Sequence, residues 1–233
     1  MKRNFFSTLF TAGVLTSAGS AATINIDFGR NDAGQLSGAG WNNVSANVGD
    51  AGSNTTSILG LVDSSNVPTT IDVGIVYVTT GGGLSAGGAG SDHDLAAYPA
   101  AVASFPDSAR SDSFFMGSSS GLMTMTFSSL DSNSTYEFLF YASRGNSGGS
   151  AEYTVTGANS DTVAISGILD NTTQAPTTLA ITPDVNNEIV VTWETTAANS
   201  ALNLMSITST PIPEPSSAAL LGLAALGLVR RRR

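Results

Sequence analysis

The sequence predicts an all-β fold, a two-sheet antiparallel sandwich or jelly roll, between residues 23 and 208. Short segments in this region alternate apolar and polar residues, which places the apolar side chains on one face of a strand. Clusters of Ser, Asn, Asp and Gly, which are typical turn formers, separate these segments. A helical period with capping residues is missing, apart from a weak one over residues 94–104. Many short strands joined by polar turns favour two packed sheets.

The expected strands follow one another along the chain. The first covers residues 24–28, with Ile24, Ile26 and Phe28 on one face. Residues 71–78 begin with the same alternation and then become apolar on both faces, as an inner strand does. Residues 79–90 are nearly all Gly, Ser, Thr and Ala, which predicts a mobile loop over one end of the sandwich. The other expected strands are residues 57–62, 122–127, 135–143, 152–156, 162–165, 188–193 and 202–207.

The N-terminal end has the three parts of a secretory signal peptide. Lys2 and Arg3 are followed by an apolar run over residues 5–15 and then by small residues up to Ala22. A positive start, a short apolar segment and a small-residue exit are typical of such peptides. We expect cleavage after Ala21 or Ala22. A transmembrane anchor is the alternative, but about eleven apolar residues are too few for a hydrocarbon core of about 30 Å.

The C-terminal end combines three features in a fixed order: a Pro-Glu-Pro triplet, an apolar segment over residues 218–229, and four terminal arginines. By the positive-inside rule, the arginines would hold this end in the cytoplasm. About the last 21 residues therefore resemble the PEP-CTERM sorting signal of Gram-negative bacteria that secrete exopolysaccharide. The residues of the triplet and of the arginine cluster are Pro213, Glu214, Pro215, Arg230, Arg231, Arg232 and Arg233.

The resemblance implies processing by an exosortase, a membrane-embedded cysteine transpeptidase, near the Pro-Glu-Pro triplet. The apolar helix, which would contact the inner membrane transiently, and the arginines would then be removed. A permanent C-terminal anchor is the alternative. The chain would divide into a signal peptide (1–22), a β-domain (23–208) and a linker with the sorting tail (209–233). The expected location is the cell envelope, the outer surface or the extracellular matrix of a Gram-negative bacterium.

Removal of both ends leaves a strongly acidic domain. Arg30, Arg110 and Arg144 are its cations, against seventeen carboxylates between residues 22 and 211, so its formal charge is near −14. A nucleic-acid partner is disfavoured, because phosphate binding needs a basic surface. The chain has no cysteine, which excludes thiol chemistry and zinc sites with Cys ligands.

Short motifs in a characteristic order run through nearly the whole β-domain. They are Ile-Asp-Phe-Gly (26–29), Trp-Asn-Asn (41–43), Leu-Val-Asp (61–63), Asp-Ser-Phe-Phe (112–115), Phe-Ser-Ser-Leu-Asp (127–131), Tyr-Glu-Phe (136–138), Ala-Ser-Arg (142–144), Tyr-Thr-Val-Thr-Gly (153–157), Pro-Asp (183–184), Glu-Ile-Val-Val-Thr (188–192) and Leu-Asn-Leu-Met-Ser-Ile (202–207). This order resembles galactose-binding-like β-jelly-roll modules, which occur in bacterial surface proteins and beside carbohydrate-active enzymes. The resemblance implies a jelly roll and a glycan ligand.

Residues suited to catalysis are few, and we expect no enzymatic activity. His93 is the single histidine and stands between Asp92 and Asp94, an arrangement that suits a metal ligand or a general base. A serine triad would also need a Gly-x-Ser-x-Gly elbow between a strand and a helix. The one loose match, residues 117–121, lies between two expected strands. We therefore favour a solvated loop histidine and no catalytic residue; a carbohydrate-active hydrolase or esterase stays the alternative.

Structural calcium is the candidate cofactor. Hard cations are bound by several carboxylate and carbonyl oxygens, usually from loops, and modules of the resembled kind often carry one. Asp92 and Asp94 fit best, because alternate residues of an extended loop can point the same way. Plain surface carboxylates are the alternative. The other candidate aspartates are Asp27, Asp32, Asp63 and Asp184.

Candidate sugar-binding residues combine aromatic rings with polar neighbours, since rings stack on pyranose faces while amides and guanidinium groups bind hydroxyls. Each aromatic could instead fill the core, and Trp193, which ends an expected inner strand, suits the core well. For the two arginines of the later chain, a bidentate clamp on a carboxylate is favoured over a ligand-binding role. The candidate ligand-binding residues are Trp41, Asn42, Asn43, Tyr98 and Arg144.

These features together predict an exported, non-catalytic surface or matrix protein that contacts exopolysaccharide or another glycan. A purely structural matrix protein without a defined ligand is the alternative.

Overall fold

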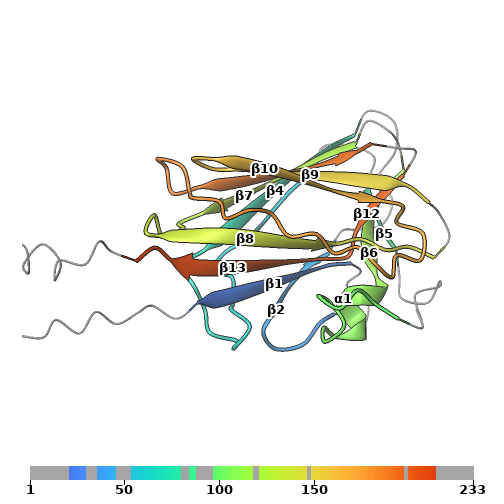
Figure 1. Ribbon diagram of the computed structural model, residues 1–233, viewed down its shortest axis with the longest axis horizontal. Helices are drawn as coiled ribbons and strands as arrows, with labels where there is room; N and C mark the ends of the chain where they lie inside the picture. The colour runs from blue at the N-terminus through green and yellow to red at the C-terminus, as the bar shows by residue number, and fades with distance from the viewer. Residues whose placement is uncertain are drawn as a thin grey trace, which may run out of the picture. The chain divides into compact units, whose positions relative to one another are not determined.

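The computed structural model describes residues 21–29, 36–45, 54–79, 84–87, 97–117, 121–145, 148–196 and 199–213. Within these ranges the chain forms three sheets and one short helix. The two larger sheets pack as the layers of a sandwich, which is one compact unit over Ala21–Ile212 (Figure 1). The all-β sandwich expected from the sequence is confirmed. Residues 1–20 of the expected signal peptide (1–22) and the apolar segment of the sorting tail lie outside the described residues.

The first layer is a four-stranded sheet in the order β2-β1-β13-β8. β13 pairs antiparallel with both of its neighbours, whereas β1 and β2 are parallel. This parallel pair departs from the purely antiparallel sandwich expected from the sequence. Two strands can be parallel neighbours only if the chain returns to the starting end of the first strand before the second begins. The members are β1 (Ala22–Gly29), β2 (Trp41–Ser45), β8 (Ser134–Tyr141) and β13 (Leu204–Pro211).

The second layer is a six-stranded sheet in the order β10-β9-β11-β7-β4-β3, antiparallel throughout. Its central strands match the segments in which the sequence alternates most regularly, with Met123, Met125 and Phe127 on the inner face of β7. The members are β3 (Asn54–Ile58), β4 (Asp72–Thr79), β7 (Gly121–Ser128), β9 (Ser150–Thr156), β10 (Ser160–Ser166) and β11 (Ile189–Thr195).

A small three-stranded sheet and the helix α1 (Asp107–Ser111) lie at one end of the sandwich (Figure 1). The opposite end carries the start of β1 and the end of β13, where Ala22 is the register partner of Ser209. Both ends of the folded domain therefore leave the sandwich on the side away from α1. The small sheet has the order β12-β6-β5, with β5 (Leu84–Gly87), β6 (Ser113–Met116) and β12 (Ser200–Leu202).

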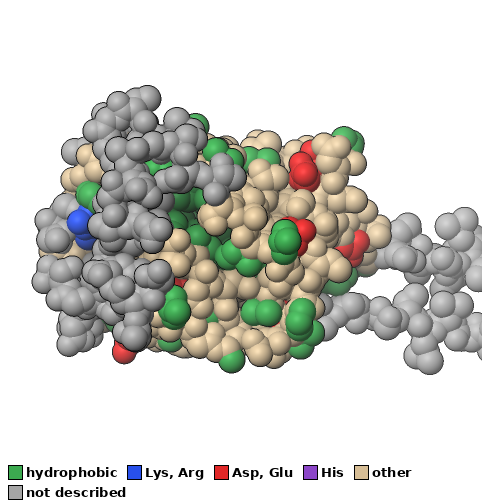
Figure 2. All heavy atoms as spheres, turned by 180° about the vertical axis from the view of Figure 1, so that it is seen from behind, with side chains coloured by type: hydrophobic (Ala, Val, Ile, Leu, Met, Phe, Trp, Pro, Cys, Tyr) green, Lys and Arg blue, Asp and Glu red, His purple; other side chains and the backbone are tan. Residues whose placement is uncertain are grey.

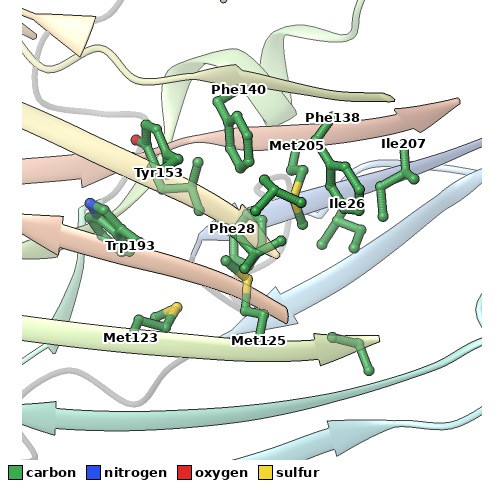
Figure 3. Packing of buried hydrophobic residues seen from close by; sticks show 14 of the residues in the cluster. Ile26, Phe28, Met123, Met125, Phe138, Phe140, Tyr153, Trp193, Met205 and Ile207 are labelled. Atoms are coloured by element: carbon green, nitrogen blue, oxygen red, sulfur yellow. The ribbon is translucent and has the colours of Figure 1, made fainter. Parts of the chain in front are cut away.

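The core lies between the two layers and is rich in aromatic side chains (Figure 3). The rings of Phe140 and Tyr153 stack with centroids 4.3 Å apart and planes 7° apart. The Tyr153 hydroxyl donates to the Ala201 carbonyl oxygen at 2.8 Å, so the one polar atom of this ring is satisfied. Trp193 is fully buried, as the sequence favours. Burial of each such side chain contributes about 1.5–3 kcal/mol, which explains how the domain stands without disulfides.

The helix is not where the sequence places it. Residues 97–104 of the expected helix 94–104 form turns and irregular backbone, and the helix begins after Pro106. Pro99 has no N–H to donate and its ring opposes a helix running through it. Asp107 lies in the first turn of α1, where its charge favours the helix dipole.

Three strands fall where the sequence predicts none. β2 contains two asparagines, which are poor strand formers, and β6 shows no alternation of apolar and polar residues. β5 occupies residues 84–87 of the expected mobile loop 79–90, and it is held by pairing with β6. Each of the three forms because a neighbouring strand supplies its hydrogen-bonding partners, which local sequence does not encode.

Candidate functional site

Three half-buried aromatic side chains, Trp41, Tyr98 and Phe105, gather on the outer face of the four-stranded sheet; we call them the aromatic patch. They pack on a small apolar cluster that includes Tyr141 and Leu204, which are register partners in β8 and β13. The segment 97–111, which carries Tyr98, Phe105 and α1, covers this part of the sheet. Residues far apart in the sequence are thereby brought together.

Trp41 starts β2 and is the register partner of Asn25. Both residues lie on the face opposite to Ile24 and Ile26, which are buried in the core. The indole meets the Phe105 ring edge to face, with centroids 5.3 Å apart and planes at 84°. Trp41 is therefore a surface aromatic that is held by a second ring and still partly exposed, which suits stacking on a ligand.

Tyr98 is held by Arg110, whose guanidinium carbon lies 3.9 Å from the centre of the tyrosine ring. The same guanidinium donates from Nη1 to the Ala103 carbonyl oxygen at 3.0 Å and forms an ion pair with Asp107. Arg110 is thus a structural clamp between the segment 97–104 and α1, although its contact with the carboxylate is through Nη2 and is not the bidentate pair that the sequence predicts. Its cation–π contact fixes the orientation of Tyr98.

The two asparagines beside Trp41 do not extend the patch. Asn42 is buried on the core side, where its Nδ2 donates to the carbonyl oxygens of Asn25 and Val62 and its Oδ1 accepts from the Val62 N–H. Asn43 lies on the same face as Trp41, but its amide is bonded to both backbone groups of Ser37. Both side chains join the edge strand to neighbouring segments. The expectation that Asn42 lies beside Trp41 at the surface is corrected, because adjacent strand residues point to opposite faces.

Arg144 does not join the aromatic patch either. Its guanidinium carbon lies 3.3 Å from the ring centre of Phe115 in β6. The guanidinium that stacks on Tyr98 in the aromatic patch is that of Arg110. Its backbone N–H donates to the Ile168 carbonyl oxygen at 2.8 Å. Burial lowers the pKa of Arg144 from its ordinary value. The carboxylate clamp expected for this side chain is replaced by a cation–π contact, which anchors the end of β8 to the small sheet.

The candidate calcium ligands Asp92 and Asp94 lie outside the described residues, as do Asp32 and His93. Asp63 and Asp184, in contrast, are turn residues, and Oδ1 of each accepts two backbone N–H groups. Asp184 Oδ1 accepts the N–H groups of Asn186 and Glu188, and the bond from Glu188 is the main reason why the pKa of Asp184 is lowered. Within the part of the chain that the structure describes, no group of three or more His, Cys, Asp or Glu residues could hold a metal ion.

Asp27 is the exception among these aspartates, because it is buried together with Asp112. Burial raises its pKa, against hydrogen bonds from Ser37 and with Asp112 that act in the opposite direction. Asp27 Oδ2 accepts the Ser37 N–H at 3.1 Å. The carboxyl of Asp112 packs on Gly29, where a Cβ would come within 1.7 Å of its Oδ2. The sequence gives no sign of this pair, since its members are far apart along the chain.

The outer face of the six-stranded sheet offers a different surface. One row across five of its strands consists of Thr162, Thr154, Thr192, Thr124 and Val76, by the strand register. The row carries hydroxyl and methyl groups, with no charge and no aromatic ring. It therefore provides matched control positions for the aromatic patch.

Comparisons with known proteins identify one sequence motif. Residues 211–233 match the model of the PEP-CTERM protein-sorting motif, in agreement with the resemblance seen in the sequence. Among curated proteins, no match is found. In the described part of the chain, no helix has the length and apolar character needed to cross a membrane.

Solved structures with a similar course of the chain share little sequence with it. The CBM22-1 and GH10 modules of Clostridium thermocellum endo-1,4-beta-D-xylanase 10B, complexed with xylohexaose, have a TM-score of 0.32 at 10% identity, over 57% of this chain and 25% of that one. Tailspike protein 4 of bacteriophage CBA120 has a TM-score of 0.31 at 11% identity, over 57% and 19%. The exo-beta-1,3-galactanase of Phanerochaete chrysosporium, with galactose, has a TM-score of 0.29 at 13% identity, over 62% and 35%.

Proposed function

We propose that this chain, which carries the PEP-CTERM protein-sorting motif at residues 211–233, is an exported envelope or matrix protein that binds polysaccharide without catalysing a reaction. The motif supports export and sorting. The observation that supports polysaccharide binding is the aromatic patch, in which Trp41, Tyr98 and Phe105 share one surface and stay partly exposed.

Sorting would involve one covalent exchange at the tail. An exosortase cysteine thiol attacks the carbonyl carbon of a peptide bond near residues 213–215. The new thioester holds the acyl group of the β-domain, and the amine leaves with the apolar segment. A hydroxyl, an amine or water then takes the acyl group and frees the thiol. The reaction leaves the β-domain on the outer side of the membrane, where the polysaccharide is.

The chemistry of the aromatic patch fits a neutral or weakly charged sugar chain. Aromatic faces bind the apolar side of a pyranose ring, and the nearby exposed carboxylate of Asp107 can accept hydrogen bonds from sugar hydroxyls. The formal charge near −14 between residues 22 and 211 opposes binding of a strongly acidic polysaccharide at low ionic strength. We therefore expect a neutral sugar chain as the ligand.

The test uses the mature protein and exopolysaccharide purified from the producing strain. Trp41→Ala and Tyr98→Ala should each weaken co-sedimentation about tenfold, which corresponds to an aromatic contact worth about 1.4 kcal/mol. Thr192→Ala, on the outer face of the other sheet, is the matched control and should bind as the native protein does. Circular dichroism checks that each variant is folded.

Three outcomes would decide between the proposed function and its alternatives. Native protein that does not bind the polysaccharide would support a purely structural matrix role, whereas Trp41→Ala and Tyr98→Ala variants that bind as well as the native protein would show that the aromatic patch is not the binding surface. Turnover of glycan or ester substrates that is lost in His93→Ala or Asp94→Ala would show a hydrolase instead. Inertness on a broad substrate panel together with patch-dependent binding is the expected result.

A further inference from the structure

The sorting motif begins inside the sandwich. The match to the motif starts at Pro211, which is the last residue of β13 and the register partner of Ser134 in β8. The next residue, Ile212, still donates its N–H to the Asn133 carbonyl oxygen at 2.7 Å. The sequence predicts a linker that begins at Ser209 and leads into the tail, yet residues 209–212 are bonded to the sheet and to the turn before β8. Pro213 of the Pro-Glu-Pro triplet follows directly.

The last residues of β13 are held from one side. Pairing with β1 ends at Ser209, whose Oγ donates to the Ala22 carbonyl oxygen and lies within 3.2 Å of the Ala22 nitrogen. Residues 210–212, which we call the strand end, have β8 and the turn before it as their remaining described partners. Thr210 and Ile212 are exposed, and Pro211 has no N–H to donate. A segment with few buried contacts and exposed hydrogen bonds opens at low cost.

The covalent spacing leaves little room for an enzyme. Six residue steps separate Ile212 from Ala218, where the apolar segment begins, and such a stretch reaches at most about 20 Å. While that segment is in the membrane, the end of the sandwich therefore stays within about 20 Å of the hydrocarbon core, and part of this distance is taken up by the polar headgroup layer. A processing enzyme that holds an extended peptide around residues 213–215 must also contact the strand end, whose backbone is bonded to β8 and to the turn before it.

We propose that the exosortase takes the strand end only after it has left β8, so that local opening of residues 210–212 controls the rate of processing. The inference rests on the proposed processing at the Pro-Glu-Pro triplet. Opening stops by Thr208 at the latest, because this residue is paired with Thr23 of β1 on one side and with Glu137 of β8 on the other. The β-domain thus stays folded while its last three residues leave the sheet and bind to the enzyme.

A disulfide across the strand end tests the proposal. Thr135 and Thr210 are register partners, and opposed residues of antiparallel strands are close enough to be bridged. The chain has no cysteine of its own, and the periplasm is oxidising. The double variant Thr135→Cys with Thr210→Cys is expressed as the full chain with its exosortase, and pulse-chase gels follow the conversion of precursor to processed protein. We expect processing to be lost in the oxidised form and to return when dithiothreitol is added.

Two further variants separate opening from misfolding. Glu137→Cys with Thr208→Cys forms the same kind of bridge two residues deeper in the same strand pair, leaves the strand end free, and should be processed at the native rate. A Gly-Ser-Gly insertion after Ile212 in the locked variant supplies a free spacer and should restore processing without reductant. Either result would show that a disulfide in this strand pair does not block processing by misfolding the domain.

The outcomes distinguish this inference from the proposed processing itself. If the native chain is not processed, or if its conversion does not depend on Pro213, Glu214 and Pro215, the proposed processing is wrong. If the native chain is processed and the oxidised 135–210 variant is processed equally fast, opening of the strand end is not required and the inference is overturned. Slowing by the deeper bridge to the same extent would also overturn it.

Discussion

Asp27 and Asp112 place two carboxyl groups in contact inside the protein, at the end of the sandwich that carries α1. Both residues are almost fully buried, and Asp27 shares a side-chain hydrogen bond with Asp112. Two charged carboxylates in such a place would repel each other and lose their hydration. Burial accordingly raises the pKa of Asp27.

The first prediction concerns the pH dependence that this pair imposes. A carboxyl whose pKa is raised in the folded state contributes stability below its unfolded pKa, near 3.8, and loses it as the pH rises through the folded value. Replacement Asp27→Asn keeps an oxygen for the Ser37 N–H and removes the charge. We expect a higher melting temperature than the native protein at pH 7 and little difference near pH 4, measured by thermal circular dichroism. If Asp27→Asn and the native protein had equal melting temperatures at pH 7 as well as near pH 4, this prediction would be wrong.

The second prediction uses Asp184, whose carboxylate has the opposite behaviour. The pKa of Asp184 is lowered, chiefly by the N–H of Glu188, so its contribution is present above pH 3.8 and is lost as the pH falls through the folded value. Asp184→Ala should lower the melting temperature at pH 7, and the difference should shrink on acidification. A difference that stays constant down to pH 2.5 would show that the turn does not depend on the charge.

The third prediction concerns Gly29, which makes room for Asp112. A Cβ on Gly29 would lie 1.7 Å from Asp112 Oδ2, so the carboxyl and the backbone would have to move apart. Gly29→Ala should destabilise the domain by about 2 kcal/mol, as overpacking of a tight interior does. Gly74→Ala is the matched control, because its Cβ would meet nothing within 4 Å. Chemical denaturation measures both; a Gly29→Ala variant as stable as Gly74→Ala would refute the close contact.

The sequence predicts the central strands well because their signal is local. In β7, Met123, Met125 and Phe127 alternate with Thr124 and Thr126, and period two alone places the first set in the core. β2 has no such signal: it pairs with β1, and the amide of Asn42 adds hydrogen bonds to the backbone of Asn25 and Val62. These partners come from other segments of the fold, so the local sequence pattern does not predict β2.

The candidate site was predictable in part. Trp41 and Tyr98 could be chosen as aromatic residues near strand ends, and both join the same surface cluster. The strand period also implies that Asn42 and Asn43 face opposite ways once β2 is recognised. The stacking of Arg110 on Tyr98 and of Arg144 on Phe115 could not be foreseen, because each contact depends on how distant segments pack.

The last prediction concerns Asn203, a fully buried residue between β12 and β13. Its Oδ1 accepts the Ser143 N–H at 2.7 Å, and its Nδ2 donates to the Arg110 carbonyl oxygen at 2.9 Å. The side chain thereby ties the end of β8 to the helix that carries Arg110. Asn203→Ala leaves both backbone groups without this partner and should cost about 2–4 kcal/mol, since each unsatisfied buried group costs about 1–3 kcal/mol.

A second variant at this position shows whether the hydrogen bonds or the volume matter. Asn203→Asp keeps the acceptor for Ser143 but places a carboxylate where Nδ2 donates. Burial raises the pKa of such a group, so the variant should be destabilised at pH 7 and recover as the pH falls and the carboxyl becomes a donor to the Arg110 carbonyl oxygen. Asn186→Ala, in an exposed turn, is the control and should change stability by about 0.5 kcal/mol or less. Chemical denaturation at pH 5 and pH 7 checks all three. Recovery of Asn203→Asp but not of Asn203→Ala would assign the loss to the hydrogen bonds, whereas equal and pH-independent losses would assign it to packing.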